Sequence, residues 1–264
     1  MKSLYVFTGK GGVGKTTLSL AFAYELKKEG KSPLYMYFEP NVDPQKYNIL
    51  GIEHEQLNFL TCVQYYIAKK LKSQTVAKWV IKAPFFKALV NMVPGFNYLI
   101  YLGYILDHKL KKNPNMVVIL DSPSSGHALT MFEACFNFRE IFQHGVLVDD
   151  INKMLDYIFN EDILKINILA LPSPMPINEA MELKKNIEKM NYKNCHLYIN
   201  NAMGQIVGID QQTGIPPFLQ KKLSLEKEIL MANKNDIKGL IAHSTKIQFE
   251  DIVKDLAPFT QILK

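Results

Sequence analysis

Nine residues near the N-terminus have the types and the spacing of a phosphate-binding loop. The stretch 9–17 reads Gly-Lys-Gly-Gly-Val-Gly-Lys-Thr-Thr and fits the pattern G-x-x-x-x-G-K-[ST] in full. Glycines allow successive backbone N–H groups to curl around a phosphate, and the N-terminus of a following helix adds partial positive charge. In this pattern Lys15 reaches the β- and γ-phosphates of a nucleotide, and the Thr16 hydroxyl ligates Mg²⁺. The residues predicted to bind the nucleotide are Gly9, Gly11, Gly12, Val13, Gly14, Lys15, Thr16 and Thr17.

The segments on either side of this loop have the character that such a loop requires. The apolar run at 4–7 reads as a buried strand, and residues 18–26 have helical spacing without a breaker. A glycine-rich turn with a surface lysine is the alternative. The order of strand, loop and helix favours the phosphate-binding interpretation.

Two further carboxylates are predicted near the phosphates, because the carboxyl ends of strands face the ligand in doubly wound sheets. Asp121 closes the apolar run 116–121, which is typical of a central parallel strand, and can orient Mg²⁺ or its waters. Capping the next helix is the alternative role for Asp121. Glu39 and Asp43 follow the apolar run 34–38 in a charged tip, for which a solvent loop is the alternative.

The composition is that of a single globular domain of 264 residues, with 48% hydrophobic and 21% charged residues. The net charge is +6, but the lysines are scattered, which favours solvated helix faces over a nucleic-acid-binding stripe. Cys62, Cys135 and Cys195 lie far apart, so we expect free thiols in a cytoplasmic protein and neither a zinc site nor disulfides. We expect no signal peptide and no integral membrane segment, because the apolar run 96–106 is shorter than the about 20 residues that a span needs.

Residues 55–112 are predicted to form a helical subdomain. Helical periodicity runs through 57–71, 76–93 and 96–110, with breaks at Pro84 and at Pro94-Gly95. Aromatic residues are concentrated in this region. Two interpretations stay open for them: they pack a core, or they form a surface for a protein client or partner.

The rest of the chain alternates between apolar runs and helical patterns. We expect helices within 129–160, a strand at 166–171, a helix at 177–190, a strand at 196–201 and a C-terminal helix at 248–256. Between 202 and 245 lie a loop rich in Gly, Pro and Gln, a helix and a polar stretch. This alternation predicts an α/β fold: a doubly wound, mostly parallel sheet flanked by helices, in a single domain spanning 1–264 with a helical insertion.

Two motifs resemble those of one family of ATPases. Lys10 gives the loop a second lysine, K-G-G-x-G-K-T, as in the deviant Walker-A class that includes arsenite-pump ATPases, the tail-anchored-protein targeting ATPase, MinD/ParA proteins and nitrogenase iron protein. The stretch 121–129, D-S-P-S-S-G-H-A-L, resembles the D-T-A-P-T-G-H-T-L switch of the arsenite-pump and targeting members. MinD/ParA proteins do not carry this switch. The chain is therefore similar to the ArsA-type family of P-loop NTPases.

This resemblance implies roles for individual residues. Lys10 of one subunit reaches the nucleotide of its partner in a dimer, supplying charge as an arginine finger does. Glu39-Pro40 stands at the Asp-Pro of the first switch, whose carboxylate activates the attacking water. Glu39 is one methylene longer, and this departure from the pattern is expected to weaken hydrolysis. Asn200 matches the Asn that reads the adenine edge, with a turn-forming Asn-Asn as the alternative; the adenine loop itself is not identified within 202–245.

The resemblance implies an ATP hydrolase that uses ATP and Mg²⁺. Lys10, Lys15 and Glu39 are the catalytic candidates, and Thr16 and Asp121 are the candidates for metal binding. The active form would be a homodimer, or alternatively a heterodimer, that couples ATP binding and hydrolysis to opening and closing on a client or partner. The first alternative function is a nucleotide-binding regulator with little turnover. A small-molecule kinase is the second, and it would not need Lys10.

Overall fold

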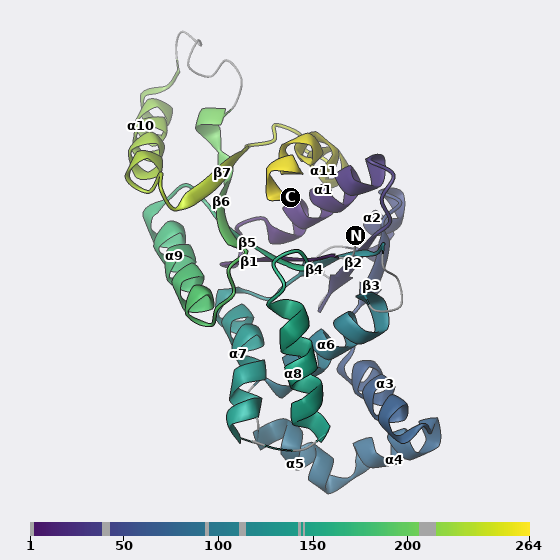
Figure 1. Ribbon diagram of the computed structural model, residues 1–264. Helices are drawn as coiled ribbons and strands as arrows, with labels where there is room; N and C mark the ends of the chain where they lie inside the picture. The colour runs from purple at the N-terminus through teal and green to yellow at the C-terminus, as the bar shows by residue number, and fades with distance from the viewer. Residues whose placement is uncertain are drawn as a thin grey trace.

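The computed structural model describes residues 3–38, 43–92, 95–110, 115–141, 144, 146–205 and 215–264. Within these residues, one seven-stranded sheet has the order β3-β2-β4-β1-β5-β6-β7, and all neighbouring strands are parallel (Figure 1). Its strands are β1 (Ser3–Gly9), β2 (Pro33–Tyr37), β3 (Glu53–Gln56), β4 (Val117–Asp121), β5 (Leu164–Ala170), β6 (Cys195–Ala202) and β7 (Ile237–Ala242). The predicted α/β class with a doubly wound sheet is confirmed, because the chain builds outward from β1 in both directions.

Helices cover both faces of this sheet (Figure 1). On the face carrying the chain termini lie α1 (Lys15–Lys28), α2 (Pro44–Ile49), α11 (Phe249–Leu256) and the 3-10 helix η4 (Ala257–Leu263). On the other face lie α3 (Phe59–Leu71), α4 (Gln74–Lys82), α5 (Pro84–Met92), α6 (Phe96–Tyr104), the π-helix η1 (Ile105–Leu110), α7 (Ser125–Ile141), α8 (Val146–Ile158) and α9 (Pro174–Lys189). Beside β6 and β7 are the short 3-10 helix η2 (Met203–Gln205) and α10 (Pro217–Ala232).

The two faces of the sheet are packed by alternate residues of the same strands. In β1, Leu4 and Val6 belong to the core under the helices α3–α9, whereas Tyr5 and Phe7 belong to the core under α1. Phe22 of α1 fixes this second core, with its ring centroid 4.7 Å from that of Tyr5 and 5.6 Å from that of Phe7. The helix that follows the glycine loop is therefore held directly over the central strand.

The helices beyond the sheet confirm the predicted break at Pro84, which is the first residue of α5. Their core is continuous with that of the sheet and includes α7 and α8 as well as residues 55–112. A helical subdomain limited to 55–112 therefore stays a prediction.

Two edge strands are absent from the sequence prediction. β3 has the sequence EHEQ, and β7 has a glycine, Gly239, inside its short apolar run. Edge strands are positioned by backbone hydrogen bonds to one neighbour. Their own side chains therefore carry little of the pattern by which a strand is predicted.

Candidate functional site

The phosphate-binding motif lies where the central strand β1 ends, between its two neighbours β4 and β5. Gly9 is the last residue of β1 and pairs with Leu169 of β5, while Phe7 pairs with Asp121, the last residue of β4. The carboxyl ends of these strands therefore meet at one edge of the sheet, as the sequence predicted. In open α/β sheets this edge is where ligands bind.

Two glycines of the loop have no room for a side chain. Gly14 caps the N-terminus of α1 with φ 91°, and a Cβ there would overlap the side-chain amide of Asn200. Gly9 has φ 140°, and a Cβ there would overlap the carbonyl oxygen of Leu169. Both conformations favour glycine, so the loop backbone can follow a phosphate closely.

Lys15 lies over the loop that precedes it. Its Nζ donates to the carbonyl oxygens of Gly9 and Lys10, at 3.0 Å each. Burial lowers the pKa of Lys15, and the nearby carboxylate of Asp121 partly opposes this by raising it. The ammonium group is thus placed inside the curve of the loop, where a phosphate would replace the carbonyl partners.

Thr16 and Asp121 are brought together from distant parts of the chain. The Thr16 hydroxyl donates to Oδ2 of Asp121 at 2.6 Å. The Tyr35 hydroxyl donates to the same oxygen at 3.0 Å, and Ser19 Oγ lies 3.2 Å from the Tyr35 hydroxyl. Burial, followed by the charge of Asp121, raises the pKa of Tyr35 well above its ordinary value, so the phenol stays a neutral donor.

This pair of oxygen ligands fits Mg²⁺. The ion is commonly held by one or two protein oxygens together with substrate phosphates and waters. Among the described residues there is no group of three or more His, Cys, Asp or Glu side chains that could hold a metal by themselves. A hydroxyl and a carboxylate beside a phosphate loop are thus suited to a metal that arrives with a nucleotide.

Lys10 points away from the loop toward α9. Its Nζ forms an ion pair with Glu179 at 2.6 Å and lies 3.3 Å from the sulfur of Met175. Both charged side chains are about two-fifths exposed, at 40% and 39%. Within one chain, Lys10 is therefore held by a surface partner, and its predicted role toward a second subunit stays a prediction.

Asn200 lies beneath the loop rather than at its rim. Its Nδ2 donates to the carbonyl oxygen of Val13 at 2.8 Å, and the residue is buried. One hydrogen of the amide thus supports the loop from β6. Reading of the adenine edge by Asn200 stays a prediction.

Only part of the first switch lies within the described residues. Glu39, Pro40, Asn41 and Val42 lie outside the described residues. Asp43, the alternative carboxylate, caps α2, since its Oδ1 accepts from the backbone N–H of Gln45 at 2.9 Å. In the second switch motif, Gly126 and His127 lie in the first turn of α7, directly after the loop that leaves β4.

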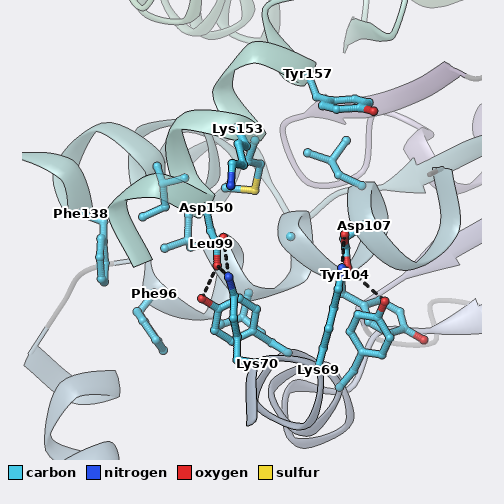
Figure 2. A pocket seen from close by; sticks show the side chains of 17 residues that line it. Lys69, Lys70, Phe96, Leu99, Tyr104, Asp107, Phe138, Asp150, Lys153 and Tyr157 are labelled. Atoms are coloured by element: carbon cyan, nitrogen blue, oxygen red, sulfur yellow. Dashed lines mark hydrogen bonds and ion pairs between the residues drawn. The ribbon is translucent and has the colours of Figure 1, made fainter. Parts of the chain in front are cut away.

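A separate pocket of about 390 Å³ lies among α3, α6, η1, α7 and α8 (Figure 2). Its apolar lining includes Phe96, Leu99, Ile100, Phe138 and Met154. Two polar clusters tie α3 to its neighbours across this pocket. Lys69 and Tyr65 contact Asp107 of η1 at 2.6 and 3.0 Å, and Lys70 and Tyr66 contact Asp150 of α8 at 2.6 and 2.7 Å.

Sequence reasoning missed Tyr35, Ser19 and Glu179. Tyr35 and Ser19 stand inside an apolar strand and an apolar helix, where a single hydroxyl reads as part of the core. Glu179 is one of several charges on an amphipathic helix. Each gains its role only from what lies opposite it in space.

Comparisons with known proteins agree with this geometry. The family model AAA_31, described as an AAA domain, matches residues 1–136, more than half of the chain. Two proteins named ATPase ASNA1 homolog, from Plasmodium berghei and Plasmodium vivax, are 25% and 26% identical over 196 residues, covering 70% of this chain and 47% of each relative. A protein of Aquifex aeolicus that carries the name arsenical pump-driving ATPase 2 is 22% identical over 303 residues, covering 98% of both chains.

The extent of these matches differs. This chain spans about half the length of the two Plasmodium relatives, whereas its match with the Aquifex protein covers both chains almost in full. Among the described residues, no helix is long and apolar enough to cross a membrane.

Replacing Tyr35 by Phe should raise the Mg²⁺ concentration needed for nucleotide binding. The change removes one of the donors that orient Asp121 and should lower the free energy of unfolding by about 1–3 kcal/mol. Ser19→Ala is the matched control, because it removes a partner of the Tyr35 hydroxyl but leaves the contact with Asp121. Urea unfolding and Mg²⁺ titration of ATP binding measure the two effects. Equal Mg²⁺ requirements in both variants would leave Tyr35 a purely structural residue.

Proposed function

This chain belongs to the AAA_31 family of P-loop ATPase domains and is a distant relative of the ArsA and ASNA1 ATPases, and from this we propose that it is a Mg²⁺-dependent ATP hydrolase that works as a dimer. The dimer would open and close on a client or partner as ATP is bound and hydrolysed. One observation carries this proposal more than any other: Thr16 Oγ1 and Asp121 Oδ2 lie 2.6 Å apart beside the glycine loop. Two oxygens so placed can bind a metal or its waters while Lys15 binds the phosphates of the same nucleotide.

Each residue then has a task that its position allows. Lys15 leaves its carbonyl partners for the β- and γ-phosphates, where positive charge stabilises the transition state. Thr16 and Asp121 would hold or orient Mg²⁺, which would neutralise charge developing on the phosphates. Tyr35 keeps the carboxylate of Asp121 in place. We assign activation of the attacking water to Glu39 and contact with adenine to Asn200.

Lys10 is the reason for proposing a dimer. An ion pair between side chains as exposed as Lys10 and Glu179 is worth about 0–1 kcal/mol, so it can be exchanged at little cost. A phosphate of a nucleotide bound to a second subunit would be a stronger partner for the lysine. The subunits would thus close when ATP is bound, because closure brings Lys10 of one subunit to the nucleotide of the other. Within a single chain, Lys10 points away from its own phosphate loop.

Mixing two inactive variants tests this directly. Lys10→Ala and Lys15→Ala should each abolish turnover as homodimers. An equimolar mixture should regain about a quarter of the wild-type rate, because half of the randomly paired dimers contain one intact composite site. Phosphate release measured over a range of protein concentrations provides the readout.

The same assay can contradict the proposal. A mixture as inactive as its two components would show that Lys10 does not act across subunits. Turnover per chain that is independent of concentration down to the lowest measurable level, with Lys10→Ala unchanged, would point to a monomeric enzyme.

Glu179→Gln should favour the closed dimer by releasing Lys10. The gain is limited by the strength of an exposed ion pair, so we expect the protein concentration for half-maximal turnover to fall by up to about fivefold. Lys184→Gln is a suitable control, since Lys184 pairs with Glu188 on the same helix and leaves Lys10 untouched. An unchanged or raised midpoint for Glu179→Gln would show that the pair supports the active form.

The pocket beside α3 supports a client on the helical layer. It is lined mainly by apolar side chains, and such a pocket suits apolar side chains of a protein partner. Gly103 of α6 lines this pocket, and a Cβ added to it would meet only the sulfur of Met154, at 3.9 Å. Space for a larger side chain therefore exists at this position.

Gly103→Leu should fill the pocket and weaken binding of an apolar helical peptide by at least tenfold, a loss of about 1.4 kcal/mol. Gly103→Ala is the matched control, because a single methyl group makes ordinary contact there. Fluorescence anisotropy of a labelled peptide gives the affinity, and ATP binding shows that the fold is kept. Equal affinity in both variants would place the client elsewhere.

One observation favours a second function. The first switch departs from the expected Asp-Pro-Ala-His at Glu39-Pro40-Asn41-Val42, and Asp43 is engaged as a helix cap. A chain with such a switch could bind ATP with little turnover and act as one half of a heterodimer. Tight ATP binding without turnover at any concentration would favour this regulator.

A further inference from the structure

The excess of positive over negative charge in this chain arises in one stretch of its sequence. Residues 56–106 contain six lysines and neither Asp nor Glu. The whole chain has 31 Lys and Arg against 25 Asp and Glu, so the remaining residues carry 25 charges of each sign. The lysines are spread along the chain, but the acids that would balance them are missing from the region of α3–α6. The net charge of +6 is therefore a local property.

The structure places two of these lysines beside one exposed tryptophan. Ala77 of α4 is fully buried, and at 100° per residue the opposite face of the helix carries Thr75, Lys78, Trp79 and Lys82. Trp79 is 77% exposed. Lys78 and Lys82 are exposed beside it, one turn apart. The outward face of α4 thus presents a large aromatic ring beside two positive charges.

Further exposed residues extend this surface at the N-terminal side of α4. Leu71, the last residue of α3, and Lys72, which caps that helix, are both exposed, as is Val76 of α4. Lys69 and Lys70 are instead paired with Asp107 and Asp150. We call the surface made by Leu71, Lys72, Val76, Lys78, Trp79 and Lys82 the α4 ridge. It lies at the end of the molecule far from the sheet and from α10 (Figure 1).

We propose that the α4 ridge docks this protein on the surface of a membrane rich in anionic phospholipids. Lysines near such a surface are attracted by its negative potential, and tryptophan favours the interface because its ring is apolar and its N–H is polar. The nine residues of α4 would lie along the plane of the interface, with this outward face against the lipid head groups.

The arrangement of the ridge suits a lipid surface. Its lysines act as point charges on flexible stems, which do not require partners in a fixed geometry. Its apolar residues are separate rather than gathered in a groove, as suits a fluid surface. This docking is independent of the proposed ATPase function.

The single tryptophan of the chain makes the proposal measurable, because all tryptophan fluorescence comes from Trp79. Vesicles of phosphatidylcholine with about 30% phosphatidylserine should shift its emission to shorter wavelength, and vesicles of phosphatidylcholine alone should not. The shift should disappear at 1 M salt, where charges are screened beyond about 3 Å. Lipids brominated near the head group should quench the emission.

Two matched variants test whether the charge acts at this place. Lys78→Glu with Lys82→Glu should weaken binding to the anionic vesicles by at least about tenfold, measured by co-sedimentation. Lys221→Glu with Lys222→Glu makes the same change in net charge on α10, where both lysines are exposed, and should bind as the wild type does. ATP binding by both variants shows that each is folded.

Three outcomes would overturn the proposal. The first is unchanged Trp79 emission on anionic vesicles. The second is an equal loss of binding in the two double variants, which would show an effect of overall charge alone. The third is a shift of the emission by a polyglutamate peptide but not by vesicles, which would assign the ridge to an acidic protein partner.

Discussion

The hydrogen bond between Thr16 and Asp121 is the contact on which the site depends. It joins the first turn of α1 to the end of β4 across 105 residues of sequence, at 2.6 Å. Neither residue can take part unless β1 and β4 are parallel and adjacent, because only then do the glycine loop and the carboxylate emerge at the same edge. A third strand, β2, also contributes, because the hydroxyl of its residue Tyr35 donates to Asp121. Three neighbouring strands therefore fix one pair of oxygen atoms.

The glycine loop is held from the other side of β1 as well. Asn200 of β6 supports it through the carbonyl of Val13, and Gly14 leaves the space that this amide fills. The loop is thus shaped by its surroundings before a nucleotide binds, which lowers the ordering cost of binding. Lys10, by contrast, is held by a partner that is itself partly exposed to solvent, Glu179. The loop 9–17 therefore combines a buried contact, between Asn200 and Val13, with an exposed ion pair that can be exchanged, between Lys10 and Glu179.

The groups suited to nucleotide chemistry and the surfaces suited to partners lie in different layers of the molecule. The sheet and α1 carry the groups suited to phosphate and metal, of which Asp121 is buried and Lys15 and Thr16 are half-buried. The helices beyond the sheet carry a pocket and the α4 ridge, with its exposed apolar and basic side chains. Two ion pairs, Lys69–Asp107 and Lys70–Asp150, hold α3 against η1 and α8. The core under these helices includes residues of β1, β2, β4, β5 and β6, so the helical layer packs directly against the sheet.

The sequence alone determined the α/β class, the phosphate loop and the carboxylate at the end of β4, because each depends on local order: a strand, then a loop or a charged residue, then a helix. The break at Pro84 is local in the same way. Only the tertiary structure decided that Tyr35 donates to Asp121, that Asn200 supports Val13 and that Lys10 pairs with Glu179. These contacts join residues 86 to 187 positions apart, and no periodicity records such a pairing. The edge strands β3 and β7 belong with them, since backbone pairing to a neighbour rather than side-chain pattern creates them.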